Sequence, residues 1–197
     1  RAGSGLHVHV SVNDARGTNL FASDDPAGTP ALRHAIGGMQ ETMAESMAIF
    51  APNANSYRRF VSESYAPVAP IWGVNNRTVS LRVPAGPPVS RHVEHRIAGA
   101  DANLYLAVAT VLGGAARGLA QRTDPGPPIT GNGYAQPMKP TLPRSWREAL
   151  DFAERSDFLA ATLGREFLKI FLAIKEQECA RFNAEVSELD YAWYLRN

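Results

Sequence analysis

The first side chains that suggest chemistry are two histidines, His7 and His9, in the run L-H-V-H-V-S-V. Apolar residues alternate with them at period two, which predicts a β-strand with both imidazoles on one face. Imidazole can ligate a divalent cation or contact a nucleotide. An H-x-H pair is also common on an ordinary polar strand face, so this pair alone leaves the function open.

Guanidinium and carboxylate groups follow the same alternation in two later segments. In residues 71–83, Arg82 lies opposite an apolar face, and in residues 92–97 Glu94 and Arg96 do so. Arginine holds phosphate or carboxylate with two parallel hydrogen bonds, and a glutamate can ligate a metal ion. We therefore expect three strands, each with an apolar face that packs against a core and a polar face that can hold metal and phosphate.

Each of these patterns also has a plainer interpretation. An E-x-R pair on one strand is usually a simple ion pair, and Arg77 and Arg82 on their own would be surface charges. The direction of Arg77 stays open, because it lies beside a possible bend at Asn75-Asn76. The order and combination of the three segments, rather than any single residue, indicate a functional site.

The remaining pattern predicts helices behind these strands. A helix begins at Pro30, with Thr29 as its N-cap, and is expected to continue to about Phe50. Residues 71–83 are expected to form a hairpin or one long bent strand. The helix at 102–119 is apolar on most sides, which predicts burial. After a Pro/Gly-rich loop at 123–143, further helices are expected at 145–154, at 163–183 and around Trp193 and Tyr194.

Length and composition place the chain in the ordinary globular class. Of 197 residues, 45% are hydrophobic, which is enough for one sizeable core. The formal net charge of +1 does not indicate binding to nucleic acid. No apolar run approaches the roughly 20 residues that span a membrane. The single cysteine, Cys179, excludes an internal disulfide and favours a reducing, cytoplasmic location.

Taken in order, four segments resemble the glutamine synthetase family. They read G-S-G-L-H-V-H-V-S, N-S-Y-R-R, N-R-T-V-S-L-R-V-P and H-V-E-H-R, and they begin at Gly3, Asn55, Asn76 and His92. The resemblance is strong from Gly3 to about Gly118 and looser from Thr123 onward. It implies an α+β fold, the C-terminal part of that family's catalytic domain, in which antiparallel strands form part of an open barrel backed by helices.

The resemblance implies an ATP-dependent ligase that uses Mg²⁺ or Mn²⁺. ATP would phosphorylate the γ-carboxylate of glutamate, and an amine nitrogen would then displace phosphate from the acyl phosphate. Roles carried over by position are metal ligation by His7 and Glu94, ATP contact by His9, Arg77 and Arg82, and glutamate binding by Gly3, Arg59 and Arg96, with Arg59 and Arg77 counted as catalytic.

The acceptor position departs from the ammonia-using members of the family. Those members place a glutamate just before an Ala-Pro pair, where this chain has Tyr65, and Glu63 lies two residues earlier. The sequence therefore resembles the γ-glutamylpolyamine synthetase branch, in which an aromatic side chain could pack against an alkyl amine. Ammonia and a polyamine both stay open as acceptors. Tyr134 lies roughly where some bacterial members are adenylylated, but its flanking residues differ and it receives no role.

The resemblance also implies missing parts. Glutamates for a second metal and an N-terminal β-grasp domain precede the Gly-Ser-Gly segment in the family, so we expect residues 1–197 to be a partial catalytic domain. Its expected parts are a strand-rich active-site region at 1–120, the loop at 123–143 and a helical tail at 144–197. Alone it is expected to be inactive, and the full-length protein is expected to be a homo-oligomer.

Two other functions compete with the ligase. One is a non-catalytic oligomerisation or regulatory module, which the apolar helix at 102–119 would support. The other is a kinase resembling the guanidino-phosphotransferases, which would need a reactive cysteine near the cleft. Cys179 lies in a charged C-terminal helix, which does not favour that second alternative.

Overall fold

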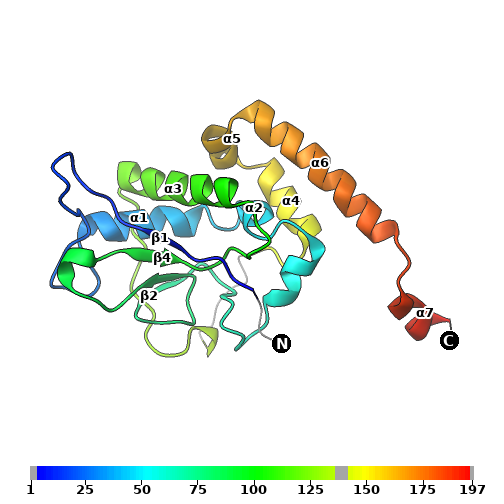
Figure 1. Ribbon diagram of the computed structural model, residues 1–197, viewed down its shortest axis with the longest axis horizontal. Coiled ribbons are helices and arrows are strands. Elements are labelled where there is room, and N and C mark those ends of the chain that lie inside the picture. The colour runs from blue at the N-terminus through cyan, green and yellow to red at the C-terminus, as the bar shows by residue number, and fades with distance from the viewer. Residues whose placement is uncertain (1–3, 136–141, 196–197) are drawn as a thin grey trace.

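The computed structural model describes residues 4–135 and 142–195 of the chain. In this part of the chain, helices cover one face of a four-stranded open sheet, which confirms the expected α+β class (Figure 1). The strands lie in the order β1-β4-β3-β2, and their bounds are Val8–Val10, Val93–His95, Leu81–Val83 and Trp72–Val74, respectively. Each is shorter than the alternation suggested, because pairing is regular over only three residues.

One strand pairing differs from the prediction. β4 pairs antiparallel with β1 and β3, but β2 pairs parallel with β3, so the expected hairpin or single long strand at 71–83 is wrong. Asn75 has a φ of 47°, and the Asn75 N–H donates to the carbonyl of Val83 at 2.8 Å. Asparagine tolerates this left-handed conformation better than most residues. Residues 75–80 thus carry the chain back, and Leu81 begins beside Trp72.

The helix expected at 30–50 is two helices. α1 (Pro30–Glu41) begins with the predicted Thr29 cap, whereas α2 (Met47–Phe50) is a separate single turn. Between them the hydroxyls of Thr42 and Ser46 donate to carbonyls four residues earlier, at 2.8 and 2.6 Å. Such bonds compete with the helical ladder, which explains why the apolar period continues while the helix does not.

Helix α3 (Leu104–Gln121) packs on α1 through glycines. A Cβ atom built on Gly118 would lie 2.1 Å from the carbonyl oxygen of His34, so the two backbones touch directly. The opposite side of α3 is open, and Leu104, Tyr105 and Leu112 are exposed. The prediction that α3 is buried on most sides is therefore wrong. Its glycine-rich face is the buried one.

Beyond residue 142, the described part of the chain forms four helices: α4 (Trp146–Glu154), α5 (Asp157–Leu163), α6 (Arg165–Ala184) and α7 (Glu188–Tyr194). α5 was not expected, although the Ser156 hydroxyl caps it by accepting from the N–H of Leu159. α6 leaves the body of the molecule, and α7 lies at its far end (Figure 1). None of the helices in the described ranges is both long and apolar enough to cross a membrane.

Candidate active site

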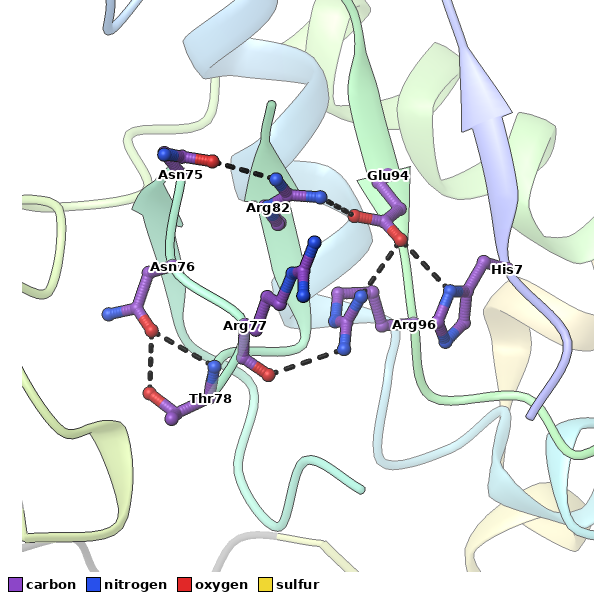
Figure 2. A network of polar contacts seen from close by, with 8 residues as sticks. All are labelled: His7, Asn75, Asn76, Arg77, Thr78, Arg82, Glu94 and Arg96. Carbon is purple, nitrogen blue, oxygen red and sulfur yellow. Dashed lines mark hydrogen bonds and ion pairs between the residues drawn. The ribbon is translucent and has the colours of Figure 1, made fainter. Parts of the chain in front are cut away.

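The carboxylate of Glu94 on β4 is the centre of a polar cluster (Figure 2). Arg82 Nη1 donates to its Oε2 at 3.0 Å, and Arg96 Nη1 donates to its Oε1 at 2.8 Å. His7 Nδ1 lies 2.9 Å from the same Oε1. Arg82 on β3 and Glu94 are partners in the strand register, so they share one face of the sheet. His7 reaches the carboxylate from just before β1.

Charge and burial set the protonation of this cluster. Burial raises the pKa of the Glu94 carboxyl, but the hydrogen bond from Arg82 and the charges of Arg96 and His7 outweigh it, so the pKa lies below its usual value. Burial and the charge of Arg96 lower the pKa of His7, although Glu94 opposes them. A neutral His7 therefore donates its Nδ1–H to an ionised Glu94 at neutral pH.

A hollow of about 360 Å³ opens over this cluster. It is lined by the four cluster residues together with Arg77 and Tyr65. The carbonyl of Arg77 accepts from Arg96 Nη2 at 3.2 Å, which fixes the backbone at this point. Within residues 4–135 and 142–195 the guanidinium of Arg77 makes no hydrogen bond or ion pair, so its donors are available to a ligand in the hollow.

A smaller hollow of about 190 Å³ adjoins the first, and His7, Tyr65 and Arg96 line both. Arg59 enters from the end of a 3₁₀ turn (Ala54–Arg59). Its Nη2 donates to the carbonyl of Ile97, its guanidinium carbon lies 4.7 Å from the Phe60 ring centroid, and burial lowers its pKa. A fixed cation beside Arg96 suits an anionic ligand such as a carboxylate.

His9 faces a third hollow, of about 740 Å³, on the other side of Glu94. Ser11, Asn19 and His92 also line it, and the rings of His9 and His92 lie 5.1 Å apart between centroids. His9 is the register partner of Glu94, but in the described part of the chain no hydrogen bond or ion pair joins its side chain to the carboxylate cluster. His92 lies two residues before Glu94 in the sequence, and sequence reasoning gave it no role.

The structure thus places most of the predicted site residues in three hollows, two of which share lining residues. His7, Arg77, Arg82, Glu94 and Arg96 share the first hollow, Arg59 lies in the second, and His9 lies in the third. Gly3 lies outside the described residues, so its predicted role has no structural account.

Asn75 was missed by sequence reasoning as a member of the cluster. Its Oδ1 accepts from Arg82 Nη2 at 2.7 Å, while Glu94 holds the other end of the same guanidinium. Asn76 was missed as well, and its side chain fixes the turn before Arg77 by accepting from the N–H and the hydroxyl of Thr78. The only signal was the Asn-Asn pair, which was interpreted as a bend.

Comparison with known proteins gives these residues a context. The chain matches the family described as "Glutamine synthetase, catalytic domain" over residues 1–194. The chain belongs to the glutamine synthetase family. This confirms the resemblance drawn from the motifs, and it gives the fold as the C-terminal catalytic-domain fold of that family.

Curated relatives in the glutamine synthetase family are ligases. The chain is 39% identical to gamma-glutamylputrescine synthetase PuuA of Escherichia coli (strain K12), over all of the chain and 41% of that protein. It is 34% identical to gamma-glutamylethanolamide synthetase GlnA4 of Streptomyces coelicolor, over 98% of the chain and 40% of that protein. The chain therefore spans about two fifths of the length of these relatives.

A solved structure of a GmaS/ADP complex has the same fold. It superposes with a TM-score of 0.88 at 27% identity and covers 99% of this chain and 46% of its own. The kinase alternative loses its support, since this family match spans nearly the whole chain and Cys179 is buried on α6, lining none of the three hollows.

The glutamine synthetase family relation raises the question of a divalent metal. His7 Nδ1 and Glu94 Oε1 lie 2.9 Å apart. Two neighbouring ligands about 2.1 Å from an octahedral cation are themselves roughly 3.0 Å apart, so a cation in place of the imidazole proton fits this pair. The described residues contain no group of three or more His, Cys, Asp or Glu side chains that could hold a metal. His7 and Glu94 would therefore supply only two of its ligands.

Proposed function

We propose that this chain forms part of an ATP-dependent glutamate–amine ligase that acts through γ-glutamyl phosphate. The observation that carries the proposal is the convergence of His7, Glu94 and three arginines on one hollow, with Arg59 in the hollow beside it. This combination suits a metal-bound phosphate next to an anionic substrate.

In the first step, a γ-carboxylate oxygen of glutamate attacks the γ-phosphorus of ATP, the bond to the β-phosphate oxygen breaks, and ADP leaves. Transfer of this kind depends on positioning and charge neutralisation more than on covalent help from the protein. Arg77 and Arg82 line the hollow where the transferred phosphoryl group would lie. Arg82 is held at both ends, whereas Arg77 retains free donors for the phosphate oxygens.

The two substrates approach from opposite sides of Glu94 in this proposal. Glutamate lies against Arg59 and Arg96, which form the cationic wall of the smaller hollow. The nucleotide extends into the hollow that holds His9 and His92, whose rings could pack against the base or contact phosphate. The metal, Mg²⁺ or Mn²⁺, would be held in part by His7 and Glu94 and would draw charge from the phosphate oxygens.

In the second step, a neutral amine nitrogen attacks the acyl carbon of γ-glutamyl phosphate. The carbon–oxygen bond to phosphate breaks, and the departing phosphate or water takes the amine proton. Tyr65 is 65% exposed and lines both hollows, so an alkyl amine can lie against its ring. The names of the two relatives specify putrescine and ethanolamine products, which supports an alkyl amine or polyamine as acceptor, with ammonia as the alternative.

We further propose that the chain needs additional parts for activity. Two protein ligands are too few for a cation that prefers six, so the remaining ligands would come from the rest of the enzyme or from ATP and water. The exposed apolar side chains of α6 and α7, among them Ile170, Phe182, Leu189 and Tyr194, support contact with a second copy in a homo-oligomer. The single cysteine supports a cytoplasmic location.

The test is phosphate release by the enzyme at the full length of its relatives, supplied with ATP, glutamate and Mg²⁺ or Mn²⁺. We expect release to depend on glutamate and to be faster with putrescine or ethanolamine than with ammonia. The chain of 197 residues should show none under the same conditions. Amine-independent ATP hydrolysis, or full activity of the chain alone, would contradict the proposal.

A further inference from the structure

Tyr134 ties the Pro/Gly-rich loop to the segment that carries Tyr65. The half-buried Tyr134 lies in a 3₁₀ turn (Gly133–Ala135), and its hydroxyl donates to the carbonyl of Ala66 at 2.9 Å. The two residues are 68 positions apart, and Ala66 is buried. Burial raises the pKa of the Tyr134 hydroxyl, so the hydroxyl keeps its proton and remains a donor at neutral pH.

The segment held by this bond is strained. Glu63 and Tyr65 have φ values of 62° and 59°, a conformation that costs a side-chain-bearing residue free energy and persists only where the surroundings enforce it. Ser64 contributes local bonds, since its hydroxyl donates to the carbonyl of Val61 and accepts from the N–H of Ala66. Tyr134 adds a contact from a distant part of the chain.

The other end of the 3₁₀ turn is anchored beside the phosphate-binding arginine. The N–H of Gly133 donates to the Thr78 hydroxyl at 2.7 Å, and a Cβ atom on Gly133 would lie 2.8 Å from the Thr78 carbonyl. Asn76 reaches the same loop, because its Nδ2 donates to the carbonyls of Ile129 and Gly131. Residues 126–135 therefore form a strap that joins the turn before Arg77 to the segment of Tyr65.

We propose that Tyr134 is a positioning residue for the acceptor pocket, by which we mean the two hollows that Tyr65 lines. Its hydroxyl holds residues 63–66 in the conformation that receives an alkyl amine. This inference rests on the proposed ligase function. Ser64 touches Arg59 only at its backbone carbonyl, at 3.2 Å. The guanidinium groups of Arg59 and Arg96, which would bind glutamate, are held by bonds outside the segment, to the Ile97 carbonyl and to Glu94. Glutamate binding should therefore not depend on Tyr134.

The test is Tyr134→Phe in the full-length enzyme, which removes one oxygen and keeps the ring. Because one hydrogen bond is lost, we expect the KM for putrescine to rise about three- to tenfold, with KM for glutamate and ATP changed less than about twofold. Tyr105→Phe is the matched control, since Tyr105 is 84% exposed at the start of α3. It should leave all three KM values unchanged.

Two further measurements separate positioning from a general loss of structure. If Tyr134 acts through Tyr65, Tyr134→Phe should raise the amine KM little when added to Tyr65→Ala, because coupled residues are not additive. Chymotrypsin should cut after Tyr65 faster in Tyr134→Phe than in the unaltered enzyme, because the segment is held less firmly. This measurement does not depend on enzymatic activity.

An unchanged KM for the amine together with unchanged cleavage after Tyr65 would overturn the role of Tyr134. The proposed ligase function would be unaffected. Equal increases in all three KM values, or full additivity with Tyr65→Ala, would also overturn it. An unaltered enzyme without amine-dependent phosphate release would overturn the proposed function and, with it, the acceptor role given to Tyr134.

Discussion

Arg82 and Glu94 face each other across the β3–β4 pairing, and their side chains form an ion pair at 3.0 Å. Arg96 adds a second ion pair to the same carboxylate at 2.8 Å. The side chains of Arg96 and Glu94 are only 6% and 5% exposed, so each charge depends on the other for compensation. Glu94 is therefore a structural centre as well as a candidate metal ligand.

Glu94→Gln should destabilise the fold, because it leaves two arginines without their counter-charge. Removing one partner of a buried pair costs about 3 kcal/mol or more, which urea unfolding measures directly. The matched control is Glu178→Gln, which breaks an exposed pair with Lys175 and should cost less than about 1 kcal/mol. Equal losses in the two variants would show that the Glu94 cluster does not behave as a buried network.

Acid stability offers a second test of Glu94. Its pKa is held below the ordinary value of 4.5 in the folded protein, so the unfolded chain binds its proton first as pH falls. The stabilisation from Glu94 is therefore complete above about pH 4.5 and is lost as pH falls through the folded pKa. Glu94→Gln should remove this part of the pH dependence. An identical acid unfolding profile in both proteins would contradict the pKa assignment.

His95 should make the protein acid-sensitive at a higher pH. Its ring packs on Phe50 at 4.8 Å between centroids, and burial lowers its pKa from 6.5 to about 3. Because the folded pKa lies below the unfolded one, stability falls as pH drops from 6.5, by up to about 1.4 kcal/mol per pH unit. His95→Leu should flatten that slope and also remove a buried Nδ1 that has no partner in the described part of the chain. A slope that stays the same would place the titrating group elsewhere.

Arg77 should matter for catalysis and little for stability. Its guanidinium lines the hollow over Glu94 and makes no hydrogen bond or ion pair within the described residues, unlike that of Arg82. Arg77→Ala in the full-length enzyme should lower kcat about 10²- to 10³-fold, as expected when a donor to a developing phosphate charge is removed. The melting temperature should stay within about 2 °C. A large loss of stability with normal kcat would reverse this assignment.

The sequence was sufficient to predict that His7, Arg82 and Glu94 meet, although it left Arg77 open and grouped His9 with His7. Alternation at period two fixes the face of His7, Arg82 and Glu94 in any strand, whatever its neighbours, and the structure brings these three together. The regular strands are shorter than predicted. The predicted apolar face of the last strand is nevertheless correct, since Val93 and Ile97, opposite Glu94, are buried.

Features that depend on distant contacts could not be read from the sequence. The parallel pairing of β2 with β3 follows from how residues 75–80 turn back, and the bond from Tyr134 to Ala66 joins segments 68 positions apart. The break after Glu41 is different, because it depends on local bonds from the Thr42 and Ser46 hydroxyls to carbonyls four residues earlier, which the apolar period does not reveal. α5, by contrast, was readable, because Ser156 and Gly164 are ordinary start and stop signals.

Removal of residues 185–197 should test the proposed homo-oligomer. The described residues of α7 include no buried side chain, so the body of the protein should keep its melting temperature within a few degrees. Leu189, Tyr191 and Tyr194 are at least half exposed and would be covered by a second copy. Sedimentation of the full-length enzyme should therefore show a smaller assembly after truncation. An unchanged assembly would exclude α7 as a subunit contact.

Gly118→Ala should separate α1 from α3 and thereby weaken the support of the sheet. The added methyl group would lie 2.1 Å from the carbonyl oxygen of His34 and 2.6 Å from the nitrogen of Gly38, and neither backbone atom can rotate away. Overpacking against backbone belongs at the upper end of the usual cost, about 3 kcal/mol, although alanine favours helix over glycine by about 1 kcal/mol. Gly86→Ala is the control, because its nearest neighbour would be the Ser90 hydroxyl at 3.5 Å, and urea unfolding should show little change. If both variants unfold at the same urea concentration, the two helices are not in the direct backbone contact that would position them behind the sheet.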